Sequence, residues 1–188
     1  METHDPNAPR PVPPAPPPAG APLGTAAGTT SYVKADPAKR FVAALIDFVI
    51  AWVVALILSM GGSLFYGIGQ FVAGAYLLVR DGLEYDFMDR RSVGKKIMKL
   101  RPVHLDGGVM DVNTSARRNW PLALGYFLGG LVALAMGAGM WTATGSLAML
   151  AWLGWLLVLV EGILVLTDKE GRRIGDKQAN TQVIESEV

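Results

Sequence analysis

Four long apolar stretches constrain this chain more than any other feature of its sequence. As a helix with a rise of about 1.5 Å per residue, each could cross a hydrocarbon core about 30 Å thick. Isolated strands would leave unpaired backbone groups in lipid, so helices are the expected form. The sequence therefore predicts an all-α membrane protein with four transmembrane helices. The stretches cover about residues 41–60, 63–79, 120–140 and 147–166.

Two of the three connections between these stretches are short. Gly61-Gly62 joins the first pair, and residues 141–146 join the second pair. The connection between the pairs is a much longer loop, residues 80–118. We therefore expect two helical hairpins, with a small structured element in the long loop, in one membrane domain over residues 37–185.

The basic residues give the predicted helices an orientation. All 17 Lys and Arg lie before residue 41, within 80–118 or after residue 166, and the two short turns contain none. Basic residues concentrate in the cytoplasmic loops of membrane proteins. We therefore expect both termini and the long loop to lie in the cytoplasm.

The first 36 residues differ in composition from the rest. They hold nine of the twelve prolines and few large apolar residues. Such a segment cannot bury enough apolar surface to offset the entropy of ordering. We expect a disordered, Pro-rich cytoplasmic tail with polyproline II character. Its PxxP spacings could fit an SH3-like groove, although a solvated spacer is the simpler interpretation.

Two acidic residues lie inside the predicted spans, Asp47 in the first and Glu161 in the fourth. An acid near the centre of a bilayer costs about 2.5–3.5 kcal/mol on insertion scales, and such residues usually face a bundle interior. Both acids lie in the cytoplasmic half, so they could form one proton or cation site. Alternatively, Asp47 pairs with an Arg or Lys at the interface, and Glu161 extends toward the headgroups.

The long loop contains a short amphipathic segment, residues 92–100. Val93, Ile97 and Leu100 would form its apolar face. We expect it to lie in the headgroup layer, because basic residues off that face are attracted to anionic lipid. The residues expected to contact lipid headgroups are Lys95, Lys96 and Lys99.

Three further short elements are expected near the membrane. An Asp-Gly turn at residues 106–107 favours a hairpin or tight loop. After the fourth span, residues 174–179 favour a short helix. Residues 181–184 have the composition of a strand, which could pair with residues 100–105 as a small cytoplasmic sheet.

Several classes of function are unsupported by this sequence. The chain has no cysteine, and its two histidines are His4 and His104, so disulfides and thiolate sites are excluded and a two-His site is not expected. Gly94-Lys95 lacks the other residues of a phosphate loop, since Asp89 and Lys96 stand where Gly and Ser or Thr would be needed. We expect no enzyme activity, no cofactor or metal, and no nucleic-acid partner.

Four blocks of the chain, in order, resemble the RDD family of bacterial membrane proteins, named for one arginine and two aspartates. Arg40 to Asp47 matches the opening block, and Ser92-Val93-Gly94-Lys95 with Leu100-Arg101 matches the loop block. Arg118-Asn119 matches the entry to the third helix, and the block from Arg173 to Val183 matches the closing block. The resemblance covers about residues 37–185. It implies a multi-pass protein of the bacterial cytoplasmic (inner) membrane.

The resemblance also suggests roles for the three named residues. They are matched here by Arg40, Asp47 and most closely Asp176, with Asp168 as the weaker candidate for the second aspartate. Arg40 and Asp176 would both lie at the cytoplasmic interface, where they could meet as a structural clasp. Asp47, deeper in the first helix, would then be the candidate functional group.

Two classes of function remain open. The family has been linked to transport, including cation/proton exchange, which would use Asp47 and Glu161. Four short helices are few for a monomeric transporter, so transport implies a homo-oligomer or other membrane subunits. The alternative is a non-catalytic membrane scaffold or accessory subunit that recruits partners through its loop and tail.

The predicted orientation can be tested by cysteine labelling, because the chain has no native cysteine. Gly61→Cys, in the first short turn, should react with a membrane-impermeant maleimide in intact cells. Asp86→Cys, in the long loop, is the control and should react only after lysis. Reaction of Gly61→Cys only after lysis would contradict the predicted topology.

Overall fold

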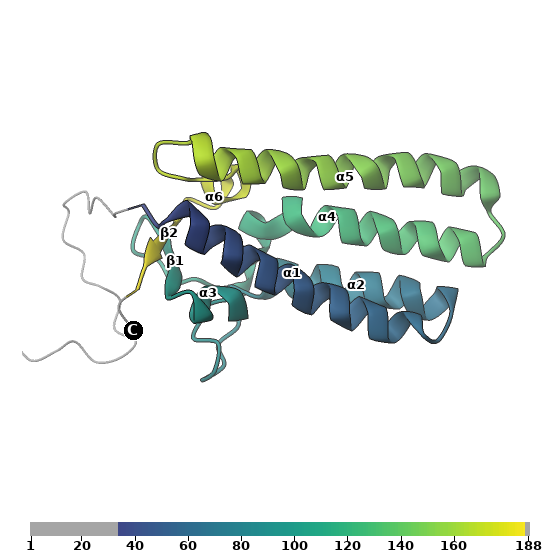
Figure 1. The fold of residues 1–188 in the computed structure, drawn as a ribbon, viewed down its shortest axis with the longest axis horizontal. Helices are drawn as coiled ribbons and strands as arrows, with labels where there is room; N and C mark the ends of the chain where they lie inside the picture. Colours follow the sequence, from purple (N-terminus) through teal and green to yellow (C-terminus); the bar gives the residue numbers. More distant parts are fainter. Residues whose placement is uncertain (1–33, 187–188) are drawn as a thin grey trace, which may run out of the picture.

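Helices dominate the computed structural model, which describes residues 34–186. Figure 1 shows long helices side by side along one axis, with the short elements gathered at one end, here called the sheet end. The predicted tail falls almost entirely outside the described residues. The elements are α1 (Pro37–Ser59), α2 (Ser63–Val79), α3 (Val93–Ile97), β1 (Leu100–His104), α4 (Val112–Gly137), α5 (Trp141–Thr167), α6 (Ile174–Gln178) and β2 (Thr181–Glu185).

Within residues 34–186, three helices are long and apolar enough to cross a membrane. These are α1, α4 and α5, with 23, 26 and 27 residues, in which an 18-residue window has a mean hydropathy of 2.8, 1.5 and 2.3. The fourth long helix, α2, is also apolar but has 17 residues. The long helices form two hairpins, α1–α2 and α4–α5, as the short connections predict.

The second hairpin begins earlier than its apolar residues suggest. α4 starts at Val112 rather than near Trp120, because Asp111 caps it: the backbone N–H of Thr114 donates to Asp111 Oδ1 at 2.6 Å. α5 starts at Trp141, where the sequence favours a turn, and the connection shrinks to residues 138–140. A run of apolar residues does not include the polar cap or the polar first turn of a helix, so it places the start of α4 too late.

The two halves of the molecule repeat the same order of elements. Each half is a helical hairpin followed by a five-residue helix and a five-residue strand. Each short helix has glycine in its second position, Gly94 in α3 and Gly175 in α6. Each strand is preceded by a residue with positive φ, Lys99 at 54° and Asn180 at 49°. The described chain is therefore two copies of one helix–helix–helix–strand unit.

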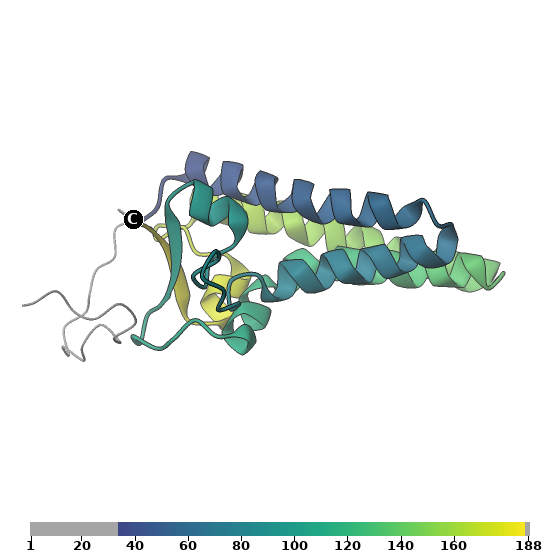
Figure 2. The same cartoon turned by 90° about the horizontal axis from the view of Figure 1, so that it is seen from below.

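The short helices pack directly against the long ones. α3 lies on α1 and α6 lies on α4 (Figure 2). A Cβ added to Gly94 would lie 2.0 Å from the carbonyl oxygen of Ala43, and one added to Gly175 would lie 1.9 Å from that of Arg118. These distances are far below van der Waals contact, so both positions require glycine.

The two strands join the halves at the sheet end. β1 and β2 pair antiparallel, from Leu100 opposite Glu185 to His104 opposite Thr181. This confirms the pairing expected from the sequence. The hairpin alternative within residues 103–112 is wrong, because Val112 begins α4 and only a turn forms at Gly107. Leu100 and Val183 pack with Ala43 of α1 in a small core beneath the sheet.

The long helices form an incompletely closed bundle. α2 packs against both α1 and α4, and α5 packs against α4, whereas α1 and α5 make few contacts. Small residues allow the close packing: Gly154 of α5 lies against Gly125 of α4, where an added Cβ would be 2.8 Å from the Gly125 Cα. In the repeat, α1 corresponds to α4 and α5 corresponds to α2. The open α1–α5 gap is therefore the counterpart of the closely packed α2–α4 interface.

The requirement for glycine at the short helices leads to a stability prediction. Gly175→Ala should destabilise the protein by about 1–3 kcal/mol, because overpacking against the backbone of Arg118 forces the two segments apart. The control is Gly162→Ala on α5, where an added Cβ meets nothing within 4 Å. Melting of the two variants in detergent checks the difference, and equal melting temperatures would contradict it.

Candidate functional site

A layer of buried charged side chains crosses the sheet end of the bundle. Nine of them, among residues 34–186, are linked by ion pairs and hydrogen bonds, and each exposes 8% or less of its surface. We call this set the charge layer. Its members are Arg40, Asp47, Arg80, Asp81, Lys95, Arg118, Glu161, Arg173 and Asp176.

The first part of the charge layer surrounds Asp47 on α1. Arg80, which directly follows α2, places Nη1 3.0 Å from Asp47 Oδ2. Asp47 Oδ1 accepts hydrogen bonds from the Gly94 backbone N–H at 2.8 Å and from the Tyr76 hydroxyl at 3.2 Å. The close approach of α3 to α1 thus brings a backbone donor to a carboxylate on a membrane helix.

Asp81, the residue after Arg80, is paired with Lys95 of α3. Lys95 Nζ donates to both carboxylate oxygens, at 2.6 and 2.7 Å. The Ser92 backbone N–H and the Asn119 amide donate to the same carboxylate at 3.2 and 3.0 Å. Burial alone would raise the pKa of Asp81, but the nearby positive charges outweigh burial and hold that pKa below its usual value.

The second part of the charge layer surrounds Asp176 on α6, a carboxylate with no exposed surface. Arg40 Nη2 lies 3.0 Å from Oδ2, and Arg118 Nη2 lies 2.8 Å from Oδ1. Arg173 donates to both oxygens at 3.2 Å and also donates its backbone N–H. Burial would raise the pKa of Asp176, but the three guanidinium groups hold it well below its usual value.

Glu161 of α5 repeats the arrangement of Asp47. The Gly175 backbone N–H donates to Glu161 Oε1 at 3.3 Å, as the Gly94 N–H does to Asp47. Arg173 Nε lies 3.6 Å from Glu161 Oε2. In both halves, therefore, the glycine of the short helix places its N–H against an acid on a long helix.

Arg118 and Asn119 of α4 connect the two parts. Arg118 approaches Asp176 through Nη2 and Asp81 through Nε, the latter at 3.7 Å. Asn119 donates to Asp81 and accepts from Arg173 Nη2 at 3.4 Å. The charge layer is consequently continuous from α1 to α6.

The two acids expected to form one joint site, Asp47 and Glu161, do not lie together. Asp47 and Glu161 are both buried, but each lies beside its own arginine, in a different part of the charge layer. Of the two alternatives for Asp47, pairing with a basic residue is the arrangement found. The predicted Arg40–Asp176 contact is present. Its role as a clasp remains a prediction.

The assignment of Lys95 to lipid headgroups is wrong. Its ammonium is buried against Asp81, because α3 turns this side toward α1 and α2. Ile97, expected on the apolar face of the segment, is 60% exposed. Lys96 lies over the Phe87 ring at 4.6 Å, and Lys99 is exposed. Headgroup contact by these two lysines stays a prediction.

Arg80, Asp81, Arg118 and Arg173 are members of the charge layer that the sequence analysis did not name as site residues. Arg80 and Asp81 stand at the end of an apolar run, where charges usually mark the water interface. The one feature that could have indicated Arg80 and Asp81 is that two adjacent residues at a helix end carry opposite charges. That pattern is too common in proteins to identify a site. Arg173 was hidden in the same way among the basic residues after the fourth span.

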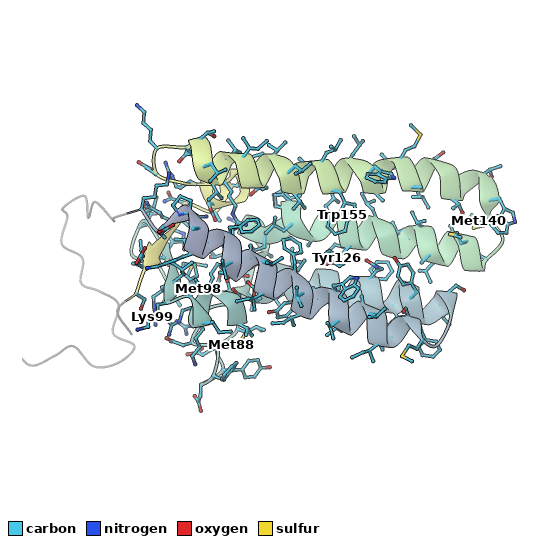
Figure 3. All side chains as sticks on the ribbon, viewed as in Figure 1. Met88, Met98, Lys99, Tyr126, Met140 and Trp155 are labelled. Carbon is cyan, nitrogen blue, oxygen red and sulfur yellow. The ribbon has the colours of Figure 1, made fainter. Side chains whose placement is uncertain are left out.

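A crevice of about 820 Å³ opens in the half of the bundle away from the charge layer. It lies beside the α1–α5 gap and has a mostly apolar lining. Trp155, which lines the crevice, is the first of three aromatic rings in contact. Tyr126 is tilted against Trp155 with centroids 5.3 Å apart, and Phe48 is stacked on Tyr126 at 6.4 Å. Figure 3 shows Tyr126 and Trp155 in the middle of the bundle. The lining includes Ser59, Ser63, Tyr66, Gly129, Trp152 and Trp155.

The Arg40–Asp176 contact can be tested by a double-mutant cycle. Asp176→Ala should destabilise the protein by about 3–5 kcal/mol, because it leaves buried arginines without their carboxylate. Arg40→Ala should also destabilise the protein, but by less, because Arg118 and Arg173 still pair with Asp176. The double variant should lose less than the sum. Lys39→Ala is the control, since its pair with Glu185 is exposed to water and should contribute little to stability. Strict additivity, measured by melting in detergent, would contradict the clasp.

Comparison with known proteins agrees with this architecture. The model of the RDD family matches residues 34–180, a range that includes every residue of the charge layer. No curated protein and no solved structure matches the chain. RDD proteins are membrane proteins, in keeping with the long apolar helices. Because the match covers most of the chain, this protein belongs to the RDD family.

Proposed function

We propose that the protein spans the bacterial cytoplasmic membrane four times, with the sheet end and both termini in the cytoplasm. The positions of the basic residues support this orientation, because they flank the sheet end and are absent from the two distal turns. α2, although short, is paired along its length with α1 and α4 and would cross a locally thinned bilayer.

We further propose that the protein transports a small cation or protons, and the observation that carries this proposal is the charge layer. Buried ion pairs cost desolvation free energy, and apolar side chains of similar volume often stabilise a protein as well or better. Ionisable residues within membrane helices mostly serve ion or proton pathways. Nine linked charges at the ends of membrane helices are more than anchoring of the helices requires.

The crevice and the three rings support the same proposal. A solute moving from the crevice toward the sheet end would pass Trp155, then Tyr126 and Phe48. Asp47 follows Phe48 directly in α1 and, with the Tyr76 hydroxyl, would be the first charged group beyond the rings. Passage would require both separation of the rings and rearrangement of the Asp47–Arg80 pair. The structure would thus be a state closed at the sheet end.

Transport by this chain would involve a homo-oligomer or other membrane subunits. Outside its contact with α4, α5 exposes large apolar side chains, including Trp152 at 72% and Leu159 at 63%. In a bilayer these side chains face lipid or another membrane helix. Either partner is compatible with the small number of helices in one chain.

The test is cation/proton exchange in proteoliposomes that contain a pH-sensitive dye. The wild type should collapse an imposed pH gradient when Na⁺ or K⁺ is added, and Asp47→Asn should abolish at least nine-tenths of that rate. Asp86→Asn, on the exposed loop, is the matched control and should keep the wild-type rate. Absence of exchange by folded wild type, or full exchange by Asp47→Asn, would refute the proposal.

A scaffold remains the second candidate because one observation favours it. The loop between α2 and α3 presents Tyr85 and Phe87 outward, at 64% and 65% exposure. A groove of about 760 Å³ lies beside this loop, between residues 82–90 and 109–116. Exposed aromatic residues beside a groove are typical of protein contacts. Folded wild type without exchange would favour this role.

A further inference from the structure

The charges in the charge layer do not balance. It contains five basic and four acidic side chains. In the first part, Arg80 and Lys95 offset Asp47 and Asp81. In the second part, Arg40 and Arg173 offset Glu161 and Asp176.

Arg118, which bridges the two parts, therefore carries a surplus positive charge. A net charge buried away from water is costly, and proteins commonly remove such a charge by a change of protonation. An arginine guanidinium does not release its proton in proteins, whereas a buried lysine does so readily. Protonating an acid would enlarge the surplus. Lys95 is consequently the one member whose deprotonation balances the charge layer.

We propose that Lys95 is the group through which the charge layer exchanges a proton with water. When Lys95 is charged, the charge layer has one positive charge more than it has negative charges. When Lys95 is neutral, four arginines balance four acids. Use of this proton in transport rests on the function proposed above, but the titration itself does not.

The geometry accommodates both forms of Lys95. When the amine is neutral, Asp81 still faces Arg118 Nε at 3.7 Å and keeps hydrogen bonds from Asn119 and Ser92. The neutral amine retains two N–H donors for the same carboxylate. Lys95 also lies at the rim of the charge layer, since 9% of its side chain is exposed against none for Asp81 and Arg118. A proton passing between Lys95 and water would therefore have less of the charge layer to cross than one passing from Asp81 or Arg118.

Lys95 interacts with charged groups from three neighbouring long helices or their ends. They are Asp81 and Arg80 at the end of α2, Arg118 of α4 and Asp47 of α1. Burial and the two arginines outweigh the two acids and lower the pKa of Lys95 to about 7. The unfolded chain, with an ordinary lysine, therefore binds more protons between about pH 7 and 10. The free energy of unfolding should therefore rise with pH across that window. Below about pH 7, Lys95 is protonated in both states, so the free energy of unfolding is lower there and does not change with pH through this group.

The experiment is an NMR titration of the full chain in detergent micelles, with ¹³Cε-labelled lysine. The chain has seven lysines, Lys34, Lys39, Lys95, Lys96, Lys99, Lys169 and Lys177. One signal should titrate with a midpoint near pH 7. Lys95→Arg should remove the low signal, and the control Lys96→Arg should remove one of the other six.

Two further variants keep the proposal open to refutation. Should Lys95→Arg fail to fold, a chain with the other six lysines replaced by arginine retains Lys95 alone, and its single signal should titrate near pH 7. Asp81→Asn should lower the midpoint by at least one pH unit, because the carboxylate stabilises the ammonium. Seven wild-type midpoints above pH 9, or a low signal that survives Lys95→Arg, would overturn the proposal.

The outcomes separate this inference from the transport function. Exchange in proteoliposomes together with seven high midpoints would leave transport standing and refute the role of Lys95. A low midpoint assigned to Lys95 in a protein without exchange would support the titration and refute transport.

Discussion

The fully buried Asp176 carboxylate holds together more of this molecule than any other group. It forms ion pairs with arginines of three segments: Arg40 at the start of α1, Arg118 of α4 and Arg173 beside α6. Hydrogen bonds and ion pairs of this kind strengthen in a low dielectric, but they repay desolvation only when the geometry is good and every acid is satisfied. Asp176 therefore fixes where the second short helix sits, and with it the strand that follows. The position of β2 against β1, and so the joining of the two repeats, depends on this interaction.

Close backbone approach makes the rest of the charge layer feasible. Gly94 and Gly175 let α3 and α6 lie directly on long helices, which brings one peptide N–H to each of Asp47 and Glu161. A peptide donor carries no net charge, so it satisfies a carboxylate oxygen without adding to the local surplus of cations. The repeat uses this device twice, although the charged residues around it differ: Lys95 in α3 stands where Asp176 stands in α6.

Much of this architecture follows from the sequence, and the gaps have identifiable causes. Apolar length predicts the two hairpins, and strand-like composition predicts the pairing of β1 with β2. The contact of Arg40 with Asp176 could be predicted because the family resemblance points to both residues and both lie on the same expected side of the spans. Lys95 could not be placed, because in a five-residue helix one turn decides which side is buried, and a lysine is almost always on the outer side. Its burial depends on Asp81, a residue whose partner becomes visible only once α2 and α3 are folded together.

The distribution of charge between the repeats also has a consequence for synthesis. Asp47, Arg80, Asp81 and Lys95 all belong to the first repeat, so this half completes a neutral set of ion pairs from its own residues. The second set is not self-contained, because Asp176 draws Arg40 from the beginning of the chain. Chains generally fold from the N-terminus as they emerge from the ribosome. The first repeat can therefore complete its ion pairs before the second repeat is translated, while Arg40 meets Asp176 only after α6 has been made. A chain that stops before residue 176 would hold Arg40 without its carboxylate, so only the complete second repeat closes the charge layer.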